Sequence, residues 1–289
     1  MQKLLEHAGF LFALMALITA LSTTGCGGEK SSAPESNKDK VTIGVITNLN
    51  ASEIEYNEVM KKLEKSYRPS KANHSAEYKY FDKVNDMQMA LEAGQIDMLS
   101  TYQNVAEYMI QRSDNKEILE SERRLGDSFC FALREGDTGL QNELNKAIKA
   151  MISDGTLKKL VKEYITDLKS DEDPPAVPIT HIDGAESIKV AVTGDLPPFD
   201  LVLPDGTPAG FSTAVLSEVS KRIGKNIELV NVVGNARASI LTSKGADVVF
   251  WVAVPKDSTL LPANIDQPEG IAISEPYYHD LITHVGLKK

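Results

Sequence analysis

Hydrophobic and polar residues follow two periods along this chain, and from residue 41 onward stretches of one period alternate with stretches of the other. Short runs rich in β-branched residues predict strands, whereas apolar residues three and four positions apart predict helices. Strands are predicted at 41–46, 77–81, 96–100, 128–135, 188–192, 199–203, 227–232, 247–254 and 281–287. Helices are predicted at 52–67, 87–93, 104–111, 140–151, 157–165, 215–223 and 236–243. Such alternation is typical of the α/β class.

Local signals place the ends of several elements. Ser52 with Glu55 three residues later forms a capping-box pattern, which predicts the start of the first helix. Gly94 and Gly224 follow the last apolar positions of their helices and predict the C-terminal ends. The tripeptide PDG at 204–206 predicts a turn between a strand and a helix.

One segment breaks the alternation, and one short pattern occurs on both sides of it. Residues 166–187 are rich in acidic residues, Pro and Gly and show no periodicity, so they predict a linker. LEAGQID at 91–97 and LTSKGAD at 241–247 both run from the last Leu of a helix, through a Gly, to an Asp before an apolar strand. This recurrence favours two similar α/β lobes.

Composition limits the classes of function. The chain has 289 residues, of which 42% are hydrophobic and 25% charged, so it can form one large or two medium cores. A formal net charge of −10 and the lack of a basic run interleaved with aromatic residues exclude a nucleic-acid partner. Cys130 lies within the apolar run SFCFAL and is interpreted as a small buried hydrophobe.

The N-terminal segment is typical of an export signal. Lys3 precedes an uncharged stretch from Ala8 to Gly28, and the small residues before Cys26 resemble a bacterial lipoprotein signal. Thr23 departs from that pattern, which has Leu three places before the Cys. We therefore expect a signal peptide at 1–25, a lipid on Cys26 and a polar tether at 26–40, with an uncleaved membrane anchor as the alternative.

Longer motifs carry a resemblance to a known family. VAVTGDLPPFDLVLPDGTPAGFSTAVLSEVSKRIG at 190–224 resembles the start of the bacterial extracellular solute-binding proteins of family 3, and SEPYY at 274–278 resembles the end of their first lobe segment. The stretches at 40–53, 90–110 and 131–165 are similar to the second lobe, the second crossover and the terminal helices of that family. Relative to the family, the order is rotated.

The resemblance implies a periplasmic binding protein-like (type II) fold of two lobes in circularly permuted order. The linker would join the usual C-terminus of the family to its usual N-terminus, because a flexible segment of about 22 residues reaches roughly 25 Å. The implied domains are lobe two at 41–125, a hinge crossover at 126–135, and lobe one at 136–289, which contains the linker.

The same resemblance points to the binding site, and there the chain departs from the family. Amino-acid-binding members hold the ligand's carboxylate with an Arg and its ammonium with an Asp, since buried charges need partners. No Arg occurs between Arg237 and Lys289, and Lys256 and Asp257 stand where the Arg is expected. Tyr102 stands where the Asp is expected. An ordinary α-amino acid is therefore not the expected ligand.

Other candidate ligand-binding residues follow from their places in these motifs. Asn48 and Asn50 occupy the anion nest that is Gly-Thr-Thr in the family. Asp195 precedes the PPF motif at the expected edge of the cleft, Trp251 offers a flat apolar wall, and Arg237 lies in the first turn of its helix.

Each candidate also has a purely structural interpretation, which the sequence leaves open. Asp195 is also explained as a turn former, Trp251 as core packing, Tyr102 and the two Asn residues as helix-start caps, and Arg237 and Lys256 as solvated cations.

The leading hypothesis is an exported, lipid-anchored and monomeric protein that captures a small polar solute for an ABC permease and uses no cofactor. The first alternative is a ligand-free sensor or scaffold of the same fold, because both charge-clamping residues are missing. The second is a dehydratase-type enzyme, which the sequence disfavours: it has no nucleophile elbow, phosphate loop or HExxH motif, and His279 and His284 lack a metal-specific spacing. We predict that the protein is not an enzyme and holds no metal.

Overall fold

The computed structural model describes residues 40–47, 57–58, 75–119, 125–170, 172–255, 267 and 269–288. By its contacts the chain divides into two compact units, Met1–Asn37 and Lys38–Lys289, and all described residues belong to the second. The predicted signal peptide, most of the tether and nearly all of the first predicted helix lie outside the described residues. Within these ranges, no helix is both long and apolar enough to cross a membrane.

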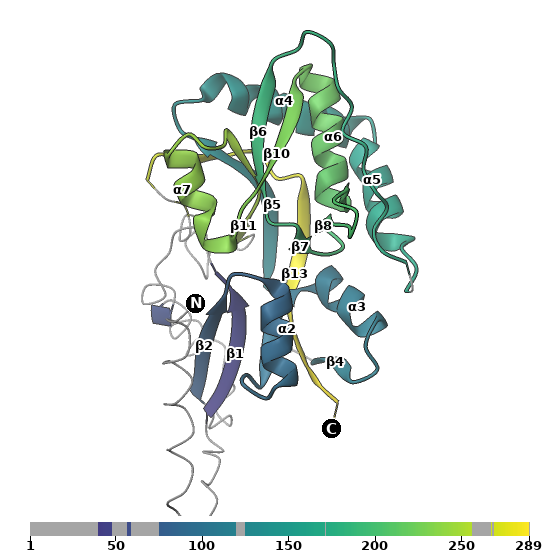
Figure 1. Ribbon diagram of the computed structural model, residues 1–289, viewed down its shortest axis with the longest axis vertical. Coiled ribbons are helices and arrows are strands. Elements are labelled where there is room, and N and C mark those ends of the chain that lie inside the picture. The colour runs from purple at the N-terminus through teal and green to yellow at the C-terminus, as the bar shows by residue number, and fades with distance from the viewer. Residues whose placement is uncertain are drawn as a thin grey trace, which may run out of the picture. The chain divides into compact units, whose positions relative to one another are not determined.

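A mixed sheet of ten strands forms the framework of the fold (Figure 1). Its main path runs β10-β6-β11-β5-β13-β3-β1-β2, with β12 beside β5 and β4 beside β13. The strands are β1 Lys40–Ile46, β2 Ser75–Phe81, β3 Met98–Tyr102, β4 Lys116–Leu119, β5 Gly126–Arg134, β6 Ser187–Val192, β10 Asn226–Asn231, β11 Val248–Pro255, β12 Ile271–Ile273 and β13 Tyr278–Leu287. A second sheet contains three short strands, β7 Asp195–Leu196, β8 Asp200–Val202 and β9 Pro208–Ala209.

Helices cover the sheet, as the α/β prediction requires. They are α2 Val84–Glu92, α3 Gln103–Gln111, α4 Thr138–Ser153, α5 Thr156–Val161, α6 Phe211–Ile223 and α7 Arg237–Thr242, with a π-helical turn η1 at Lys162–Thr166 and a 3-10 turn η2 at Gly234–Ala236. The helix predicted at 140–151 is confirmed as part of α4, whose apolar residues Leu144, Ala147, Ile148 and Met151 are buried. The predicted end of α6 is also confirmed, because Gly224 adopts a left-handed conformation with φ of 67°.

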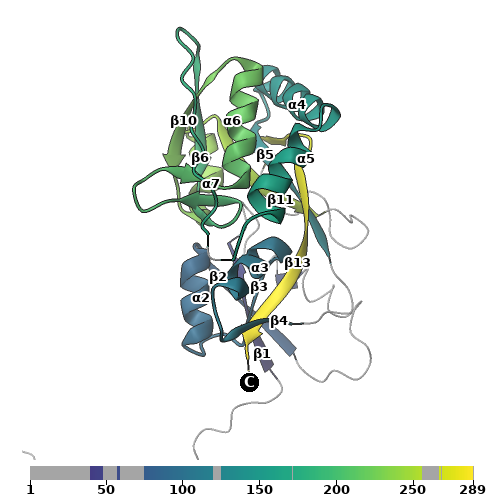
Figure 2. The same cartoon turned by 90° about the vertical axis from the view of Figure 1, so that its right-hand side faces the viewer.

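The architecture is two-lobed. We use lobe two for β1–β4 with α2 and α3, and lobe one for β6–β12 with α4–α7. The strands β5 and β13 connect them, because β13 pairs with β5 through Tyr278–Leu281 and with β3 through Ile282–Val285. In Figure 2 the yellow β13 runs along the molecule beside elements of both lobes.

The recurrence seen in the sequence corresponds to a repeated unit. In lobe two, β1 pairs in parallel with β2 and β3. In lobe one, β6 pairs in parallel with β10 and β11. Each unit then has a helix, α2 or α7, immediately before its third strand. The prediction of two similar α/β lobes is confirmed.

The segment predicted as a linker contains no helix or strand between 172 and 186, but it is packed rather than loose. Val177 is buried, and its backbone N–H donates to Pro208 O over 2.8 Å. The Ile182 N–H donates to Asn226 Oδ1 over 2.7 Å. The flexible linker expected from composition is wrong in this respect, because Val177 supplies apolar surface that lobe one buries.

Cys130 fulfils its prediction. Its side chain is buried in lobe one, and burial raises the pKa of its thiol to about 12. A thiol with such a pKa stays protonated at neutral pH and is a poor nucleophile.

Candidate functional site

The structure describes four of the candidate binding residues, namely Tyr102, Asp195, Arg237 and Trp251. Asn48, Asn50, Lys256, Asp257 and the lipidation candidate Cys26 lie outside the described residues. The four described candidates come from both lobes, since Tyr102 ends β3 in lobe two and the others belong to lobe one. They lie where the lobes meet.

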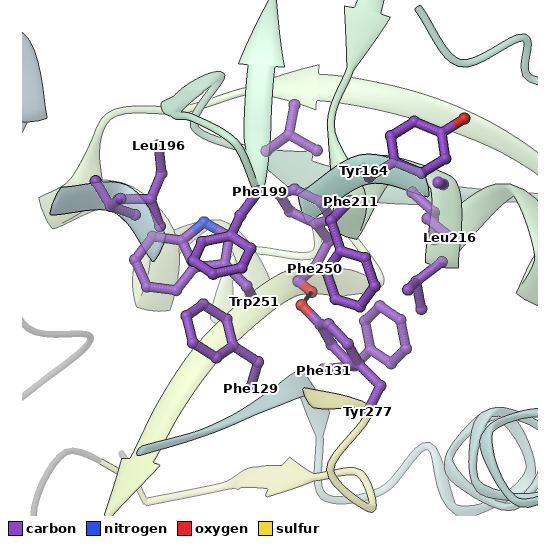
Figure 3. Close-up of a cluster of buried hydrophobic side chains, with 14 of the residues drawn as sticks. Phe129, Phe131, Tyr164, Leu196, Phe199, Phe211, Leu216, Phe250, Trp251 and Tyr277 are labelled. Atoms are coloured by element: carbon purple, nitrogen blue, oxygen red, sulfur yellow. Dashed lines mark hydrogen bonds between the residues drawn. The ribbon is translucent and has the colours of Figure 1, made fainter. Parts of the chain in front are cut away.

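Aromatic rings join the lobes at this place. We define the aromatic cluster as Tyr102, Phe129, Phe199, Phe211, Trp251 and Tyr278. The Tyr102 ring centroid lies 4.7 Å from that of Phe129 and 6.5 Å from that of Trp251. The Phe129 and Phe199 centroids are 4.8 Å apart. Figure 3 shows Phe129, Phe199 and Trp251 turned toward one another. Such offset and edge-on contacts stabilise the meeting of β3 with lobe one beyond the area that they bury.

Trp251 is part of the packed core as well as of the junction. It is 4% exposed, and its indole N–H donates to Thr193 Oγ1 over 3.4 Å. Asp200 holds Thr193 in place by accepting a hydrogen bond from its hydroxyl over 2.8 Å. Burial raises the pKa of Asp200 to about 6, and its hydrogen bonds from Thr193 and Gly194 oppose that rise. Both interpretations of Trp251 are therefore compatible with its position.

Arg237 is buried rather than solvated, so the structural interpretation offered for it is wrong. It is 4% exposed, and its guanidinium lies 4.4 Å from the centre of the Trp251 ring. The guanidinium donates to Gly234 O, to Trp251 O and, over 3.0 Å, to Thr47 O at the end of β1. Backbone carbonyls and an aromatic face together make burial of this cation tolerable.

Asp195 also contacts the other lobe. Its Oδ2 accepts the backbone N–H of Val84, the first residue of α2, over 3.0 Å. Burial raises the pKa of the Asp195 carboxyl, and the hydrogen bond from Val84 partly offsets that rise. Asp195 thus has a role that neither the ligand hypothesis nor the turn hypothesis anticipated.

A second carboxylate makes a corresponding contact that sequence reasoning missed. Asp82, directly after β2, accepts the backbone N–H of Asn235 over 3.1 Å and its side-chain amide over 2.8 Å. The two residues are 153 positions apart. Their one available signal is that each follows a predicted strand and precedes a predicted helix, which places both at the carboxyl ends of strands.

The connecting strands hold two further acidic residues that the sequence analysis did not single out. Asp127 of β5 and Asp280 of β13 are direct cross-strand partners and are 8% and 7% exposed. Asp280 accepts the backbone N–H groups of Asn104 and Leu281. Burial, together with the charge of Asp280, raises the pKa of Asp127 to about 6. Among the described residues, no three His, Cys, Asp or Glu side chains come together as a metal site would require.

Comparison with known proteins places the chain in a family. The family model for bacterial extracellular solute-binding proteins, family 3, matches residues 70–167 and 188–256, which is more than half of the chain. No curated protein sequence matches the chain.

Solved structures show more distant similarity. The ligand-binding core of GluR0 from Nostoc punctiforme, in complex with L-glutamate, is 9% identical and has a TM-score of 0.39, over 86% of this chain and 85% of that one. Tv2483 bound to L-arginine is 11% identical and has a TM-score of 0.42, over 87% and 79%. The effector-binding domain of QuiR in complex with shikimate is 11% identical and has a TM-score of 0.40, over 86% and 88%.

Proposed function

Because the chain belongs to the bacterial extracellular solute-binding proteins of family 3, we propose that it captures a small polar solute between its two lobes and delivers it to an ABC-type importer. The observation that carries this proposal is the meeting of Tyr102 from lobe two with Trp251 from lobe one, at a ring distance of 6.5 Å. A solute held there would contact both lobes at once, which is how hinge closure is coupled to binding.

The proposed ligand is amino-acid-like but is not a standard α-amino acid. The chain has no Arg between Arg237 and Lys289 to pair with a carboxylate, and Tyr102 stands where the family has an Asp for the ammonium. Arg237 itself is already bonded to three backbone carbonyls.

The remaining site residues are assigned roles by position. Tyr102 and Trp251 would form the walls, Asp195 would lie at the rim, and the buried Arg237 would set the charge behind Trp251. Asn48, Asn50, Lys256 and Asp257 would supply further polar contacts. The proposal contains no catalytic step, in keeping with a family of binding proteins.

We further propose that the protein is exported and held on the membrane as a monomer by a lipid on Cys26, in the periplasm or at the cell exterior. We also propose the circularly permuted order, with lobe two at 41–125, the hinge crossover at 126–135 and lobe one at 136–289. The break in the family match between residues 167 and 188 supports this order, because it coincides with the segment proposed to join the family's usual termini.

A ligand-free sensor or scaffold is the second candidate. The specific observation that favours it is the set of hydrogen bonds that the protein's own groups make between the lobes, at Asp82, Asp195 and Arg237. A protein whose own side chains hold the lobes together can adopt one shape without a ligand.

The test is a thermal-shift panel on the full chain, refolded from denaturant to remove any carried-over solute. Amino acids, amines, dicarboxylates and short peptides are the probes. A ligand at about 100 times its Kd adds roughly 2.7 kcal/mol, which raises the Tm of a protein of this size by several degrees. A flat panel on folded protein would overturn the proposal in favour of the second candidate.

Matched variants then locate the binding. Tyr102→Phe removes one hydroxyl at the lobe junction, and it is expected to weaken the response to the solute found. Tyr164→Phe removes a hydroxyl from η1, on a ring that is not one of those defined as the aromatic cluster, and it is expected to leave that response unchanged.

A further inference from the structure

Two contacts between the lobes are reciprocal. Asp195 of lobe one accepts an N–H at the start of α2 in lobe two. Asp82 of lobe two accepts two N–H groups of Asn235, in η2 immediately before α7 of lobe one. Because α2 and α7 occupy the same place in the repeated unit, each lobe presents a carboxylate to the corresponding turn of the other.

The first contact completes a helix that is otherwise uncapped. The N-cap residue of α2 is Lys83, and no side chain makes a capping hydrogen bond within that helix end. A helix start leaves backbone N–H groups without partners and carries partial positive charge, so a carboxylate there is stabilising. Asp195 supplies this carboxylate from the other lobe, and α2 is therefore capped only when the lobes are together.

The second contact is close enough to restrict the residue beside it. A Cβ atom on Gly234 would lie 3.0 Å from Asp82 O and 3.4 Å from Asp82 Cα. Gly234 does not adopt a left-handed backbone conformation. The approach of lobe two, and not the local conformation, is therefore what favours glycine at this position.

A third contact lies on the segment first interpreted as a linker. Tyr108 of α3 donates its hydroxyl to Asp173 Oδ1 over 2.8 Å, and Arg112 stacks 3.6 Å from the Tyr108 ring while donating to Glu172 O. The segment is fixed to lobe one at Val177 and Ile182, so it also ties α3 to lobe one.

We propose that Asp82 and Asp195 form a reciprocal latch that holds the two lobes together before any solute arrives. The latch acts as a positioning device for the proposed binding site, and its effect on affinity rests on the proposed function. The apparent affinity for a solute falls with the fraction of protein that is not in the binding-competent state. Breaking the latch lowers the population of that state and therefore weakens solute binding.

The test measures hydrogen exchange in the solute-free full chain, peptide by peptide. Asp195→Asn removes the carboxylate that binds Val84, and faster exchange in peptides over 82–91 follows locally. The decisive readout is the other contact: we expect exchange over 233–241, including Asn235, to accelerate about tenfold as the lobes separate. Unchanged exchange over 233–241 would overturn the latch.

A second variant separates the lobes by disturbing the Asp82 contact instead of the Asp195 contact. Gly234→Val places a side chain against Asp82 and is expected to accelerate exchange over 82–91, including Val84 whose partner Asp195 is untouched. Gly136→Ala is the control, because a Cβ there meets nothing within 4 Å. If Gly234→Val folds and leaves 82–91 unchanged, the contacts are independent and the latch is wrong.

Measurements of solute affinity distinguish a failure of the latch from a failure of the proposed function. Once a solute is found, the latch predicts about a tenfold loss of affinity in Asp195→Asn and in Gly234→Val. If no solute binds but the exchange coupling is present, the proposed function fails and the latch stands. If a solute binds the variants as tightly as the parent chain and the exchange is uncoupled, only the latch fails.

Discussion

The two lobes share one hydrogen bond in their repeated unit, from a strand N–H to an Asp carboxylate. They differ in whether that carboxylate is also paired with a cation. In lobe two, Asp97 Oδ2 accepts the N–H of Thr42 over 2.7 Å. In lobe one, Asp247 Oδ2 accepts the N–H of Lys189 over 2.9 Å. In both, the backbone N–H of the same Asp donates back over 2.8 Å, to Thr42 O or Lys189 O. The Asp that ends each sequence motif is thus a structural tie between the first and third strands.

The fastening differs because only one of these carboxylates meets a cation in the part of the chain that the structure describes. Arg134 of β5 lies 2.8 Å from Asp247 and also donates to Ala246 O over 2.6 Å. Asp97 has no ion pair among the described residues. Lobe one is therefore bound to the connecting strand by charge as well as by strand pairing, and we expect it to move together with β5.

The turns before these Asp residues differ as well. Gly94 takes the left-handed position in lobe two, with φ of 67°, whereas Lys244 takes it in lobe one, with φ of 60°. The Gly that both motifs contain therefore stands one place later in lobe one, at Gly245. There a Cβ would lie 2.9 Å from Ile240 Cγ1. The same short pattern uses its glycine for conformation in one lobe and for close approach in the other.

The largest expected effect comes from removing the ion pair between Arg134 and Asp247 in lobe one. Asp247→Asn leaves the partly buried Arg134 with Asp137 as its remaining carboxylate partner and weakens the bond to Lys189, so we expect a loss of about 2–3 kcal/mol of unfolding free energy. Asp97→Asn, which weakens only the equivalent backbone bond, should cost about 1 kcal/mol. Urea unfolding of both variants checks the difference, and equal losses would show that Arg134 adds nothing.

The next largest effect concerns Asp127, whose buried carboxylate makes stability depend on pH. The folded-state pKa of Asp127 is about 6, above its ordinary 3.8, so the folded protein binds more protons than the unfolded chain between those pH values. Its contribution to stability therefore falls as pH rises from about 4 to 6 and stays unfavourable above 6. Asp127→Asn should stabilise the protein by about 2 kcal/mol at pH 8 and have little effect at pH 4.

Thermal unfolding at the two pH values checks this prediction. The parent chain and Asp127→Asn are compared in the same buffers, so other titrating groups cancel. A stabilisation that is as large at pH 4 as at pH 8 would mean that the titration of the buried Asp127 is not the cause.

Stability should depend more on the residue at the left-handed position of lobe two, Gly94, than on the residue at the equivalent position of lobe one, Lys244. Gly94→Ala puts a Cβ on a left-handed residue and should cost about 1–2 kcal/mol. A Cβ at this position meets no atom within 4 Å, so a loss would come from conformation alone. Denaturant unfolding measures it, and a variant as stable as the parent would contradict the conformational argument.

The smallest effect is a gain in lobe one. Lys244→Gly relieves a left-handed non-glycine residue but gives the unfolded chain more freedom, so we expect a net stabilisation of about 0.5 kcal/mol. The pair of Gly94→Ala and Lys244→Gly should therefore change stability in opposite directions. A loss in both variants would show that Lys244 contributes something other than its backbone.

The sequence predicted the long elements because their periods extend over enough residues to be read. The short strands β4, β7, β9 and β12 were missed, since two to four residues show no period. Helix α2 begins at Val84 rather than at Met87, and its first N–H binds Asp195 of the other lobe, a contact that the local pattern does not contain.

The site was less predictable for a related reason. The four described candidates do meet, but the pattern could not show that Arg237 is buried by carbonyls of distant residues such as Thr47. Asp82 and Asn235 were not singled out, because a place between a predicted strand and a predicted helix does not by itself pair two polar residues 153 positions apart. Contacts between lobes depend on topology, which local periodicity does not contain.

The most direct test of solute capture between the lobes uses Trp251, the single Trp of the chain. Its ring is 4% exposed and lies 6.5 Å from Tyr102 of the other lobe, so its emission reports on the lobe junction. The refolded full chain is titrated with each member of the solute panel, with Trp251→Phe as the blank. The account predicts a saturable change in Trp251 emission with at least one solute. Emission that stays unchanged across the whole panel, while Trp251 remains buried, would contradict it.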